Sequence, residues 1–373
     1  MNILLIPDSF KGSATSMEVI DALTRGFQTL DQNVNLFSVV ASDGGEGFLD
    51  SIDHQLEVET IWHDSLDPIG RPIETTYLFD RSNNTAYIEL AKASGLDCLS
   101  RPEQNPMTTT TIGTGMQILH AINKGAKTIY VGLGGSATND GGIGLASVLG
   151  YRFLDENGTP ILPIGKQLSS VRNIEGAFTY EKIKIKAIND VANPLYGPHG
   201  AAHTYAEQKG ANSEEIKILD QGLVNLASVV EKYDQLEHHD FSGAGAAGGV
   251  GYGLKVFCNA EFISGTDFLF DLAKVEMLLS EEKIDVIITG EGRIDSQTMQ
   301  GKLIQGILDL AKPKQIKVVA ICGQLNLSTE TYKDFGLHYA TTIAKPGTSP
   351  EESIKNALQY IEEVPRRIWP FIS

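Results

Sequence analysis

Cysteine is scarce in this sequence of 373 residues, and its three thiols lie far apart. Cys98, Cys258 and Cys322 share no Cys-x-x-Cys spacing and have no histidine pattern beside them, so neither a zinc site nor a disulfide framework is indicated. Separate thiols of this kind are typical of core residues in a reducing compartment. No apolar run approaches the roughly 18 residues that a membrane span needs, and no basic leader precedes the first apolar run. The sequence therefore predicts a cytoplasmic protein.

The chain also has no excess of basic residues, since 47 acidic residues outnumber 30 basic ones and the net charge is −17. Nucleic-acid binders usually present a basic face, and proteins of membrane surfaces usually carry a basic amphipathic helix. Neither pattern is present in the sequence, so we expect no nucleic-acid partner and no membrane partner. A phosphorylated small molecule remains compatible with this charge, because backbone N–H groups, a few basic side chains and a cation can bind phosphate locally.

A Walker-type phosphate loop is missing, because Gly301-Lys302 is followed by Leu303 and lacks the required spacing. Two segments do match dinucleotide-binding patterns, at residues 132–137 and 243–248. Five small or polar residues separate the first from any apolar helix, and a poor strand, residues 238–241, precedes the second. The matches are weak, but they leave a nicotinamide-dependent hydroxy-acid oxidoreductase open as an alternative.

Both ends of the chain alternate short apolar runs with amphipathic segments, and the length favours two α/β domains. Residues 3–6 predict a strand buried on both faces, and Thr15 with Glu18 forms a capping box before an apolar helical stripe. Further strands are expected at residues 36–40, 284–289, 318–321 and 339–343. The sequence therefore predicts an α/β fold with a Rossmann-like, doubly wound parallel sheet built from both chain ends.

The middle of the chain differs from the two chain ends in its pattern of predicted elements. Residues 75–79 and 85–90 predict a β-hairpin, residues 112–123 a helix, and residues 128–131 and 183–188 two more strands. We expect residues 71–274 to form an inserted mixed α/β domain, and residues 1–70 plus 275–373 to form the Rossmann-like domain. The active site is expected in the cleft between the two domains.

Polar or acidic residues directly follow five of the predicted strands. In open parallel sheets, ligands bind outside the carboxyl ends of the strands, so such segments can converge on one site. The five segments are residues 8–13, 43–47, 134–142, 189–190 and 290–295. This arrangement is the strongest functional signal that the residues give by themselves.

The segment 134–142 is the most unusual of the five, because two glycine pairs flank five small or polar residues. Glycine allows positive φ and close approach of a ligand, and successive N–H groups form an anion-binding nest. Ser136, Thr138 and Asn139 add hydrogen-bonding groups, and Asp140 could touch a metal or a substrate hydroxyl. A tight strand-to-helix turn capped by Asn139 and Asp140 is the simpler alternative, but the glycine content favours a phosphate-binding loop.

Three other side chains suit phosphoryl transfer. Lys11 precedes a predicted helix N-terminus, where anions are favoured. Asp190 ends a strand and could accept a hydroxyl proton or hold Mg²⁺. Arg293 has the planar fork that binds a carboxylate or a phosphate in two-point contact. A solvated loop lysine, a turn aspartate and a surface network of Arg293 with Glu291 and Asp295 are the structural alternatives.

Seven ordered motifs resemble the bacterial glycerate kinase family, type I. They are PDSFKGS at 7–13, DGGEG at 43–47, GGSATNDGG at 134–142, DVANPL at 190–195, EQKGA at 207–211, GAGAAGG at 243–249 and TGEGRIDSQT at 289–298. Because they cover nearly the whole chain, the resemblance is specific. Ser42 and Ala192 are modest departures from the usual pattern.

The resemblance implies a phosphotransferase with an alcohol acceptor, which moves the γ-phosphoryl group of ATP to D-glycerate with Mg²⁺ and releases ADP. It favours 2-phosphoglycerate over 3-phosphoglycerate as the product, and it implies a two-domain α/β fold unrelated to P-loop kinases. A non-catalytic sensor of glycerate or nucleotide is the second alternative, and a homodimer is left open.

Under this hypothesis each polar segment has an expected role. Arg293 would bind the substrate carboxylate, Asp190 the accepting hydroxyl, and Lys11 the transferring phosphoryl group; these three are the expected catalytic residues. The remaining expectations are Asp8, Ser9 and Asp295 for the substrate, Gly134, Gly135, Ser136, Thr138 and Asn139 for the nucleotide, and Asp43 and Glu291 for magnesium.

Overall fold

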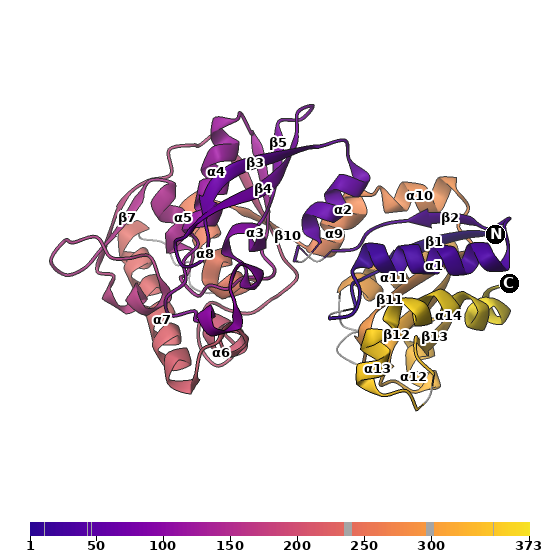
Figure 1. Ribbon diagram of the computed structural model, residues 1–373. Coiled ribbons are helices and arrows are strands. Elements are labelled where there is room, and N and C mark those ends of the chain that lie inside the picture. Colours follow the sequence, from indigo (N-terminus) through magenta and orange to yellow (C-terminus); the bar gives the residue numbers. More distant parts are fainter. Residues whose placement is uncertain (11, 43, 46, 235–240, 296–301, 346) are drawn as a thin grey trace. The chain divides into compact units, whose positions relative to one another are not determined.

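The computed structural model describes residues 1–10, 12–42, 44–45, 47–234, 241–295, 302–345 and 347–373 (Figure 1). The chain divides into two compact units. The terminal unit comprises residues 1–42, 50–55 and 266–373, and the central unit comprises residues 43–49 and 56–265. Among the described residues, none of the helices has the length and apolar character to span a membrane.

A five-stranded parallel sheet forms the centre of the terminal unit. Its strand order is β2-β1-β11-β12-β13, and every neighbouring pair is parallel. The strands are β1 Asn2–Pro7, β2 Asn35–Ser38, β11 Val286–Ile294, β12 Lys317–Leu325 and β13 Tyr339–Thr342. Both chain ends contribute strands, so the predicted doubly wound sheet is confirmed.

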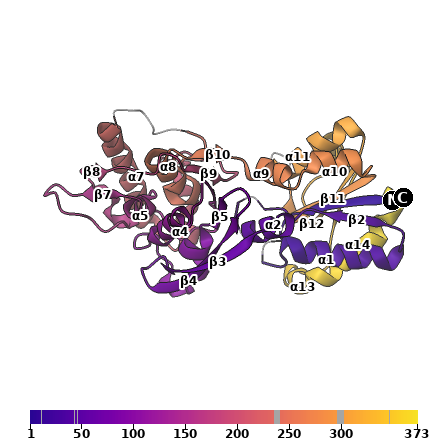
Figure 2. The same cartoon turned by 90° about the horizontal axis from the view of Figure 1, so that it is seen from above.

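Helices cover both faces of this sheet (Figure 2). Leu4 and Ile6 of β1 pack with residues of α9–α12, whereas Ile3 and Leu5 pack with α1 and α14. All four side chains are fully buried, because successive side chains of a strand point to opposite faces. The helices are α1 Ser16–Leu30, α9 Gly265–Leu272, α10 Val275–Glu281, α11 Lys302–Ala311, α12 Thr329–Asp334, α13 Pro350–Lys355 and α14 Ala357–Ile372, with a 3-10 turn at Lys312–Lys314.

Helix α1 begins at the predicted capping box. The Glu18 N–H donates to the Thr15 hydroxyl at 3.2 Å, and the Thr15 N–H donates to the Glu18 carboxylate at 2.9 Å. Gly26 lies where α1 packs against α14, and a Cβ atom there would overlap the carbonyl oxygen of Glu362 and lie 2.8 Å from Pro365 Cγ. The close packing of these two helices therefore depends on glycine at this position.

The central unit contains a six-stranded mixed sheet of order β10-β9-β6-β5-β4-β3. Strands β5, β6, β9 and β10 run parallel, whereas β3 and β4 run antiparallel to their neighbours. The predicted hairpin is present as β4 and β5. The strands are β3 Glu59–Leu66, β4 Pro72–Asp80, β5 Thr85–Glu89, β6 Thr128–Gly132, β9 Lys184–Ile188 and β10 Glu261–Ile263, and β7 Tyr151–Leu154 pairs separately with β8 Asn173–Gly176.

The helices of the central unit pack around one large apolar core that includes residues of the sheet. They are α3 Ala91–Ser94, α4 Ile112–Asn123, α5 Ile143–Val148, α6 Ala201–Tyr205, α7 Ser213–Asp234 and α8 Ala246–Cys258, with 3-10 turns at Leu96–Cys98, Arg101–Glu103, Gly165–Ser170 and Glu207–Lys209. Helix α2 Phe48–Gln55 begins in the central unit and ends in the terminal unit. The chain then enters the central unit before β3, since β3 pairs with β4.

Candidate functional site

The strand order of the terminal sheet changes direction between β1 and β11. The chain continues from β1 to β2 on one side, whereas β11, β12 and β13 extend the sheet on the other side. In open α/β sheets, ligands bind at such a switch point, outside the carboxyl ends of the strands. Asp8 directly follows β1, and its backbone N–H donates to the carbonyl of Gly290 in β11 at 2.8 Å. The two predicted segments 8–13 and 290–295 therefore begin side by side at this edge.

Strand β11 runs to Ile294, beyond the predicted end at residue 289. Glu291 and Arg293 consequently lie in a strand and not in a loop, and their side chains share one face because they are two residues apart. Arg293 Nε lies 2.9 Å from Asp295 Oδ2, and the Arg293 side chain is 61% exposed. A carboxylate thus orients the guanidinium while the side chain remains accessible from solvent.

Asp8 and Ser9 form the start of the loop after β1. The Ser9 N–H donates to Asp8 Oδ1 at 2.6 Å, and both residues are half-buried. Their position next to β11 agrees with a role in one binding site, together with Arg293 and Asp295. Lys11, predicted to be catalytic, and Asp43, predicted to bind magnesium, lie outside the described residues.

In the central unit, the parallel strands β5, β6, β9 and β10 end at a common edge. The segment after β6, residues 134–142, is called the glycine loop below. The residue just before it, Leu133, is joined to β9 by the bond from its N–H to the carbonyl of Ile188 at 3.1 Å. Asp190 follows β9, and the hydroxyl of Ser264, which follows β10, donates to Asp190 Oδ1 at 2.8 Å. The glycine loop, Asp190 and Ser264 are therefore assembled at one edge of one sheet.

Gly44 and Gly45 lie against the glycine loop, because the Gly134 N–H donates to the carbonyl of Gly44 at 2.9 Å. A Cβ atom at Gly134 would overlap the Cα of Gly45, so this contact requires glycine. Gly135 has φ of +70° and is exposed. The part of the loop that solvent reaches is therefore backbone at Gly135, in a conformation that favours glycine.

The polar side chains of the glycine loop are turned inward. Ser136 is 5% exposed, and Thr138 and Asn139 are fully buried. Ser136 Oγ lies 3.1 Å from Thr138 Oγ1 and donates to the carbonyl of Ala247 at 3.2 Å. Neither amide atom of Asn139 has a hydrogen-bond partner among the residues that the structure describes. These side chains shape the loop from behind, and the surface they leave for a ligand is peptide backbone.

The start of α8 supports the glycine loop. Ala247, Gly248 and Gly249 are three consecutive left-handed residues, with φ of 54°, 71° and 87°. The Gly141 N–H donates to the carbonyl of Gly248 at 3.1 Å, and a Cβ atom at Gly248 would overlap the carbonyl of Thr138. The segment that matched a dinucleotide pattern in the sequence is thus a tight turn packed on the loop.

Asp140 has a structural position in this region. It is fully buried, and its carboxylate accepts hydrogen bonds from the Thr111 N–H and Thr111 hydroxyl, both at 2.8 Å, and from the N–H groups of Gly142 and Gly144 at 3.1 and 3.3 Å. Burial raises the pKa of Asp140, and these hydrogen bonds oppose the shift. Asp140 therefore connects the end of the glycine loop to the start of α4.

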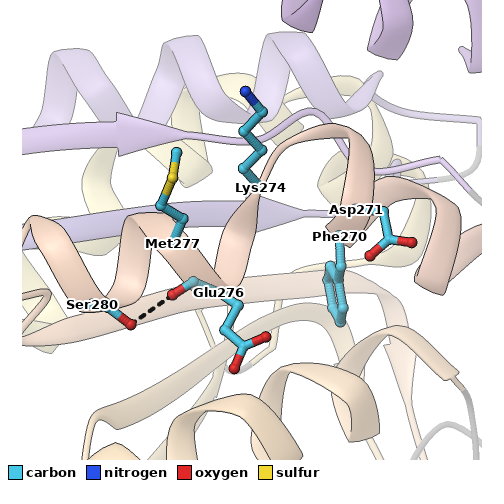
Figure 3. A pocket seen from close by; sticks show the side chains of 6 residues that line it. All are labelled: Phe270, Asp271, Lys274, Glu276, Met277 and Ser280. Carbon is cyan, nitrogen blue, oxygen red and sulfur yellow. Dashed lines mark hydrogen bonds between the residues drawn. The ribbon is translucent and has the colours of Figure 1, made fainter.

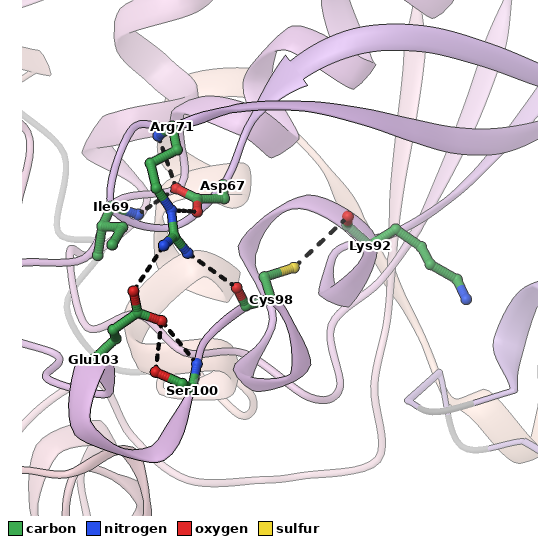
Figure 4. Close-up of polar contacts among 7 residues, drawn as sticks. All are labelled: Asp67, Ile69, Arg71, Lys92, Cys98, Ser100 and Glu103. Atoms are coloured by element: carbon green, nitrogen blue, oxygen red, sulfur yellow. Dashed lines mark hydrogen bonds and ion pairs between the residues drawn. The ribbon is translucent and has the colours of Figure 1, made fainter.

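A polar network fixes the turn beside the start of α4 (Figure 4). Buried Asp67 accepts hydrogen bonds from the Ile69 N–H at 3.0 Å, the Arg71 N–H at 2.8 Å and Arg71 Nε at 2.5 Å. Arg71 Nη1 also lies 2.7 Å from Glu103. The turn is joined to α4 by the bond from the Thr110 N–H to the carbonyl of Pro68 at 2.8 Å, next to the threonine that holds Asp140.

The carboxylate side chains present suit magnesium binding, although the described residues form no preformed cluster of metal ligands. Among the described residues, no three His, Cys, Asp or Glu side chains are grouped to hold a metal ion. Mg²⁺ bound with a nucleotide usually takes one or two carboxylates together with phosphate oxygens and water, so such a cluster is not required. Glu291 provides carboxylate oxygens at the edge of the terminal sheet.

A hollow of about 400 Å³ on α9 and α10 has a different character. The charged ends of Lys274 and Glu276 point in opposite directions (Figure 3). The hydrogen bond from Ser280 Oγ to the carbonyl of Glu276, at 2.8 Å, is a bond within one helix. The hollow is lined by Phe270, Asp271, Lys274, Glu276, Met277 and Ser280. Because its charged groups diverge, it does not resemble a substrate site.

Comparison with known proteins identifies the family. The model of the glycerate kinase family matches residues 3–373. A Bacillus subtilis (strain 168) protein named glycerate kinase is 36% identical over 372 residues, covering 99% of this chain and 97% of the relative. An Escherichia coli (strain K12) protein named glycerate 2-kinase is 33% identical over 371 residues, with coverage of 99% and 97%.

A solved structure agrees with these relatives. The crystal structure of a Salmonella typhimurium LT2 protein, provisionally assigned as glycerate kinase 2, matches with a TM-score of 0.82 at 33% identity. The match covers 99% of this chain and 97% of that one. The resemblance inferred from the seven motifs is thereby confirmed, and the chain belongs to the glycerate kinase family.

Proposed function

We propose that this protein transfers the γ-phosphoryl group of ATP to a hydroxyl of D-glycerate, giving ADP and phosphoglycerate, with 2-phosphoglycerate as the favoured product. Family membership over residues 3–373 supports the reaction, and the E. coli relative named glycerate 2-kinase supports the position of transfer. The observation that carries the proposal is the glycine loop, which presents glycine backbone at the carboxyl ends of the parallel strands of a mixed sheet.

The glycine loop is the proposed site for the ATP phosphates. Gly135 is exposed and left-handed, so a phosphate oxygen can approach its backbone without meeting a side chain. Gly134 contributes by fixing the loop on Gly44, because its N–H is already donated to that carbonyl. Ser136, Thr138 and Asn139 contribute by filling the space behind the backbone. Preorganised dipoles of this kind stabilise charge that develops on a transferring phosphoryl group.

Asp190 is proposed to receive the accepting hydroxyl of glycerate. It lies two residues after the end of β9, at the same edge as the glycine loop, and Ser264 fixes the direction of its carboxylate through Oδ1. A carboxylate held in this way can align the hydroxyl and accept its proton as the new P–O bond forms. Most of the catalytic effect in such reactions comes from positioning and electrostatics.

In the terminal unit, Arg293 is proposed to bind the substrate carboxylate. The ion pair with Asp295 orients its guanidinium, and the fork geometry matches a carboxylate. Asp8 and Ser9, next to β11, are proposed to bind the substrate with it, and Lys11 is proposed to steady the transferring phosphoryl group. Glu291 and Asp43 are the proposed magnesium ligands, and Mg²⁺, when bound, neutralises charge on the phosphates.

The cellular location and the assembly are also proposals. Separate free cysteines, of which Cys258 and Cys322 are buried, support a reducing compartment such as the cytoplasm. Burial raises the pKa of both these thiols to about 12, so they are suited to packing and not to redox chemistry. We leave a homodimer open.

A coupled assay of ADP release tests the reaction. We expect ADP to form with Mg-ATP only when D-glycerate is added, and ³¹P NMR of the product to show the phosphoryl group on the 2-hydroxyl. ADP release at the no-glycerate level would refute the kinase. Exclusive 3-phosphoglycerate would refute the proposed position of transfer and leave the kinase intact. Titration with NADH provides a control, because a nicotinamide-dependent enzyme would change its fluorescence.

A further inference from the structure

Lys209 lies inside the central unit, directly behind the glycine loop. Only 2% of the residue is exposed. Its Nζ donates to the carbonyl of Thr138 at 2.7 Å and to the hydroxyl of Ser136 at 3.3 Å. In the sequence it lies within the motif EQKGA at residues 207–211. A buried lysine with two bonds to a phosphate-binding loop is an unusual feature that requires an explanation.

The surroundings of Lys209 hold its ammonium group in an unfavourable environment. Burial lowers the pKa of Lys209 to about 7, and the carboxylate of Asp140 opposes this shift. Asp140 is itself engaged by four hydrogen bonds from Thr111, Gly142 and Gly144. A lysine is almost never fully buried unless it is paired. Burial of the Lys209 ammonium group therefore costs folding stability that an apolar side chain at this position would not cost.

The local fold turns Lys209 inward. It ends the short 3-10 turn Glu207–Lys209, and Gly210 follows with φ of +100°. A Cβ atom at Gly210 would overlap the carbonyl of Gln104, so the chain passes close to a neighbouring segment here and requires glycine. The same turn leaves Glu207 exposed. The motif therefore combines a tight turn with one buried cation.

We propose that Lys209 is the positioning residue of the glycine loop. Its ammonium group fixes Thr138 and Ser136 from behind and adds positive charge beneath the bound phosphates. This inference rests on the proposed function of the glycine loop. The Ser136 hydroxyl also donates to the carbonyl of Ala247, so Lys209, the glycine loop and the turn at the start of α8 form one connected support. Lys209 does not touch substrate in this proposal, and it acts through the loop backbone.

The proposal has an electrostatic consequence. Bound ATP brings negative charge close to Lys209, which favours its protonated form and raises its pKa. Binding of Mg-ATP is then accompanied by proton uptake near pH 8, and the affinity falls as the pH rises. Among the described charged groups around Lys209, the carboxylate of Asp140 acts on its pKa most directly. Glu207, on the same turn, is exposed. His203 on α6 is also exposed, and its Nε2 lies 3.9 Å from Asp220 Oδ2.

The first test is calorimetric and uses the wild-type protein. Mg-ATP is titrated at pH 8.0 in two buffers with different heats of ionisation. At this pH the γ-phosphate has already lost its last proton, since its pKa is about 6. We expect uptake of a measurable fraction of a proton in the wild type and none in Lys209→Met. Equal heats in the two buffers for the wild type would overturn the electrostatic part of the proposal, and this measurement does not depend on whether any variant folds.

The second test is kinetic and compares Lys209→Met with Lys209→Arg and with the exposed control Lys217→Met. Loss of a charge-assisted hydrogen bond predicts that KM for ATP rises about tenfold or more in Lys209→Met, while KM for glycerate changes less than twofold. Lys209→Arg should recover part of the ATP affinity, and its ATP affinity should not fall between pH 7 and 9. If Lys209→Met does not fold, Ser136→Ala replaces it, with a smaller rise in KM for ATP and an unchanged circular dichroism spectrum.

The outcomes separate this inference from the proposed function. An active wild type with an unchanged KM for ATP in Lys209→Met overturns the role of Lys209 and leaves the kinase intact. A wild type that binds ATP with proton uptake but does not phosphorylate glycerate supports the role of Lys209 and removes the proposed substrate. A wild type that does not bind ATP overturns both.

Discussion

Replacement of Gly132 by alanine is a direct probe of how the segment at Gly44 and the glycine loop fit together. Gly132 is the last residue of β6, its φ is not in the left-handed region, and a Cβ atom there would lie 2.6 Å from the carbonyl oxygen of Gly44 and 2.9 Å from Phe48 Cδ1. Ordinary contact begins at 3.4 Å, so the segment at Gly44 must move by about 0.8 Å, which is 3.4 minus 2.6. Because Gly44 accepts the Gly134 N–H, this movement also displaces the glycine loop.

The expected effects follow from that displacement. Overpacking of a buried position costs about 1–3 kcal/mol of unfolding free energy, measured by urea denaturation. A misplacement on the order of 1 Å at a reacting centre reduces catalysis by up to about 100-fold, so we expect kcat/KM for ATP to fall about 10–100-fold.

A matched substitution controls for the loss of glycine as such. Gly306→Ala in α11 brings its Cβ atom to 2.9 Å from Phe270 Cε2, the far end of a side chain, in a helix of the terminal unit. We expect this variant to keep kcat/KM within about twofold. Full activity in Gly132→Ala, with a stability loss of the expected size, would refute the argument that Gly44 and the glycine loop act as one fitted unit.

Three further predictions concern single positions. Asp190→Asn should lower kcat by about 100-fold or more while the urea midpoint stays unchanged, since general-base and aligning groups contribute about 10²–10⁴-fold; an unchanged kcat would remove Asp190 from the mechanism. Gly26→Ala should lower the unfolding free energy by about 1–3 kcal/mol and leave KM values unchanged, because the new methyl group overlaps the Glu362 carbonyl; equal urea midpoints would contradict this. Burial lowers the pKa of His63 and of His120, whose rings stack with centroids 4.6 Å apart. The stability present above pH 6.5 is therefore lost as the pH falls through their folded-state pKa values. The urea midpoint should drop between pH 7.5 and 5.5, and it should drop less after replacement of both residues by Gln.

Much of the fold could be predicted because its signals are local. Strand β1 is buried on both faces and therefore appears as a continuous apolar run at residues 3–6. The capping box of Thr15 and Glu18 marks the start of α1 through interactions three residues apart. The alternation of strands and helices at both chain ends indicates a parallel sheet, so the doubly wound sheet could be predicted as well.

Strand β3 Glu59–Leu66 was not predicted, and the reason is the identity of its buried residues. His63 and Ser65 face inward together with Ile61, so the strand has no continuous alternation of apolar and polar side chains. Its position also explains why the chain changes units earlier than residue 70. The extension of β11 to Ile294 was likewise missed, because glycines at 290 and 292 usually indicate a loop.

The candidate site was predictable in its location but not in its inner organisation. The carboxyl ends of parallel strands place the glycine loop and Asp190 at one edge, and strand topology alone requires this. The inward direction of Ser136, Thr138 and Asn139, and the burial of Lys209 behind them, depend on contacts between residues 70 or more positions apart. Such contacts leave no periodic signal in one sequence.

Hydrogen–deuterium exchange with and without Mg-ATP tests the central claim that the glycine loop receives the nucleotide. We predict that saturating Mg-ATP slows exchange at residues 132–142, and at the supporting turn 243–249, by more than at the hollow on α9 and α10. The same experiment with NADH should leave these peptides unchanged. Unaltered exchange at residues 132–142 under conditions where ATP is bound, with protection confined to another part of the chain, would contradict the account.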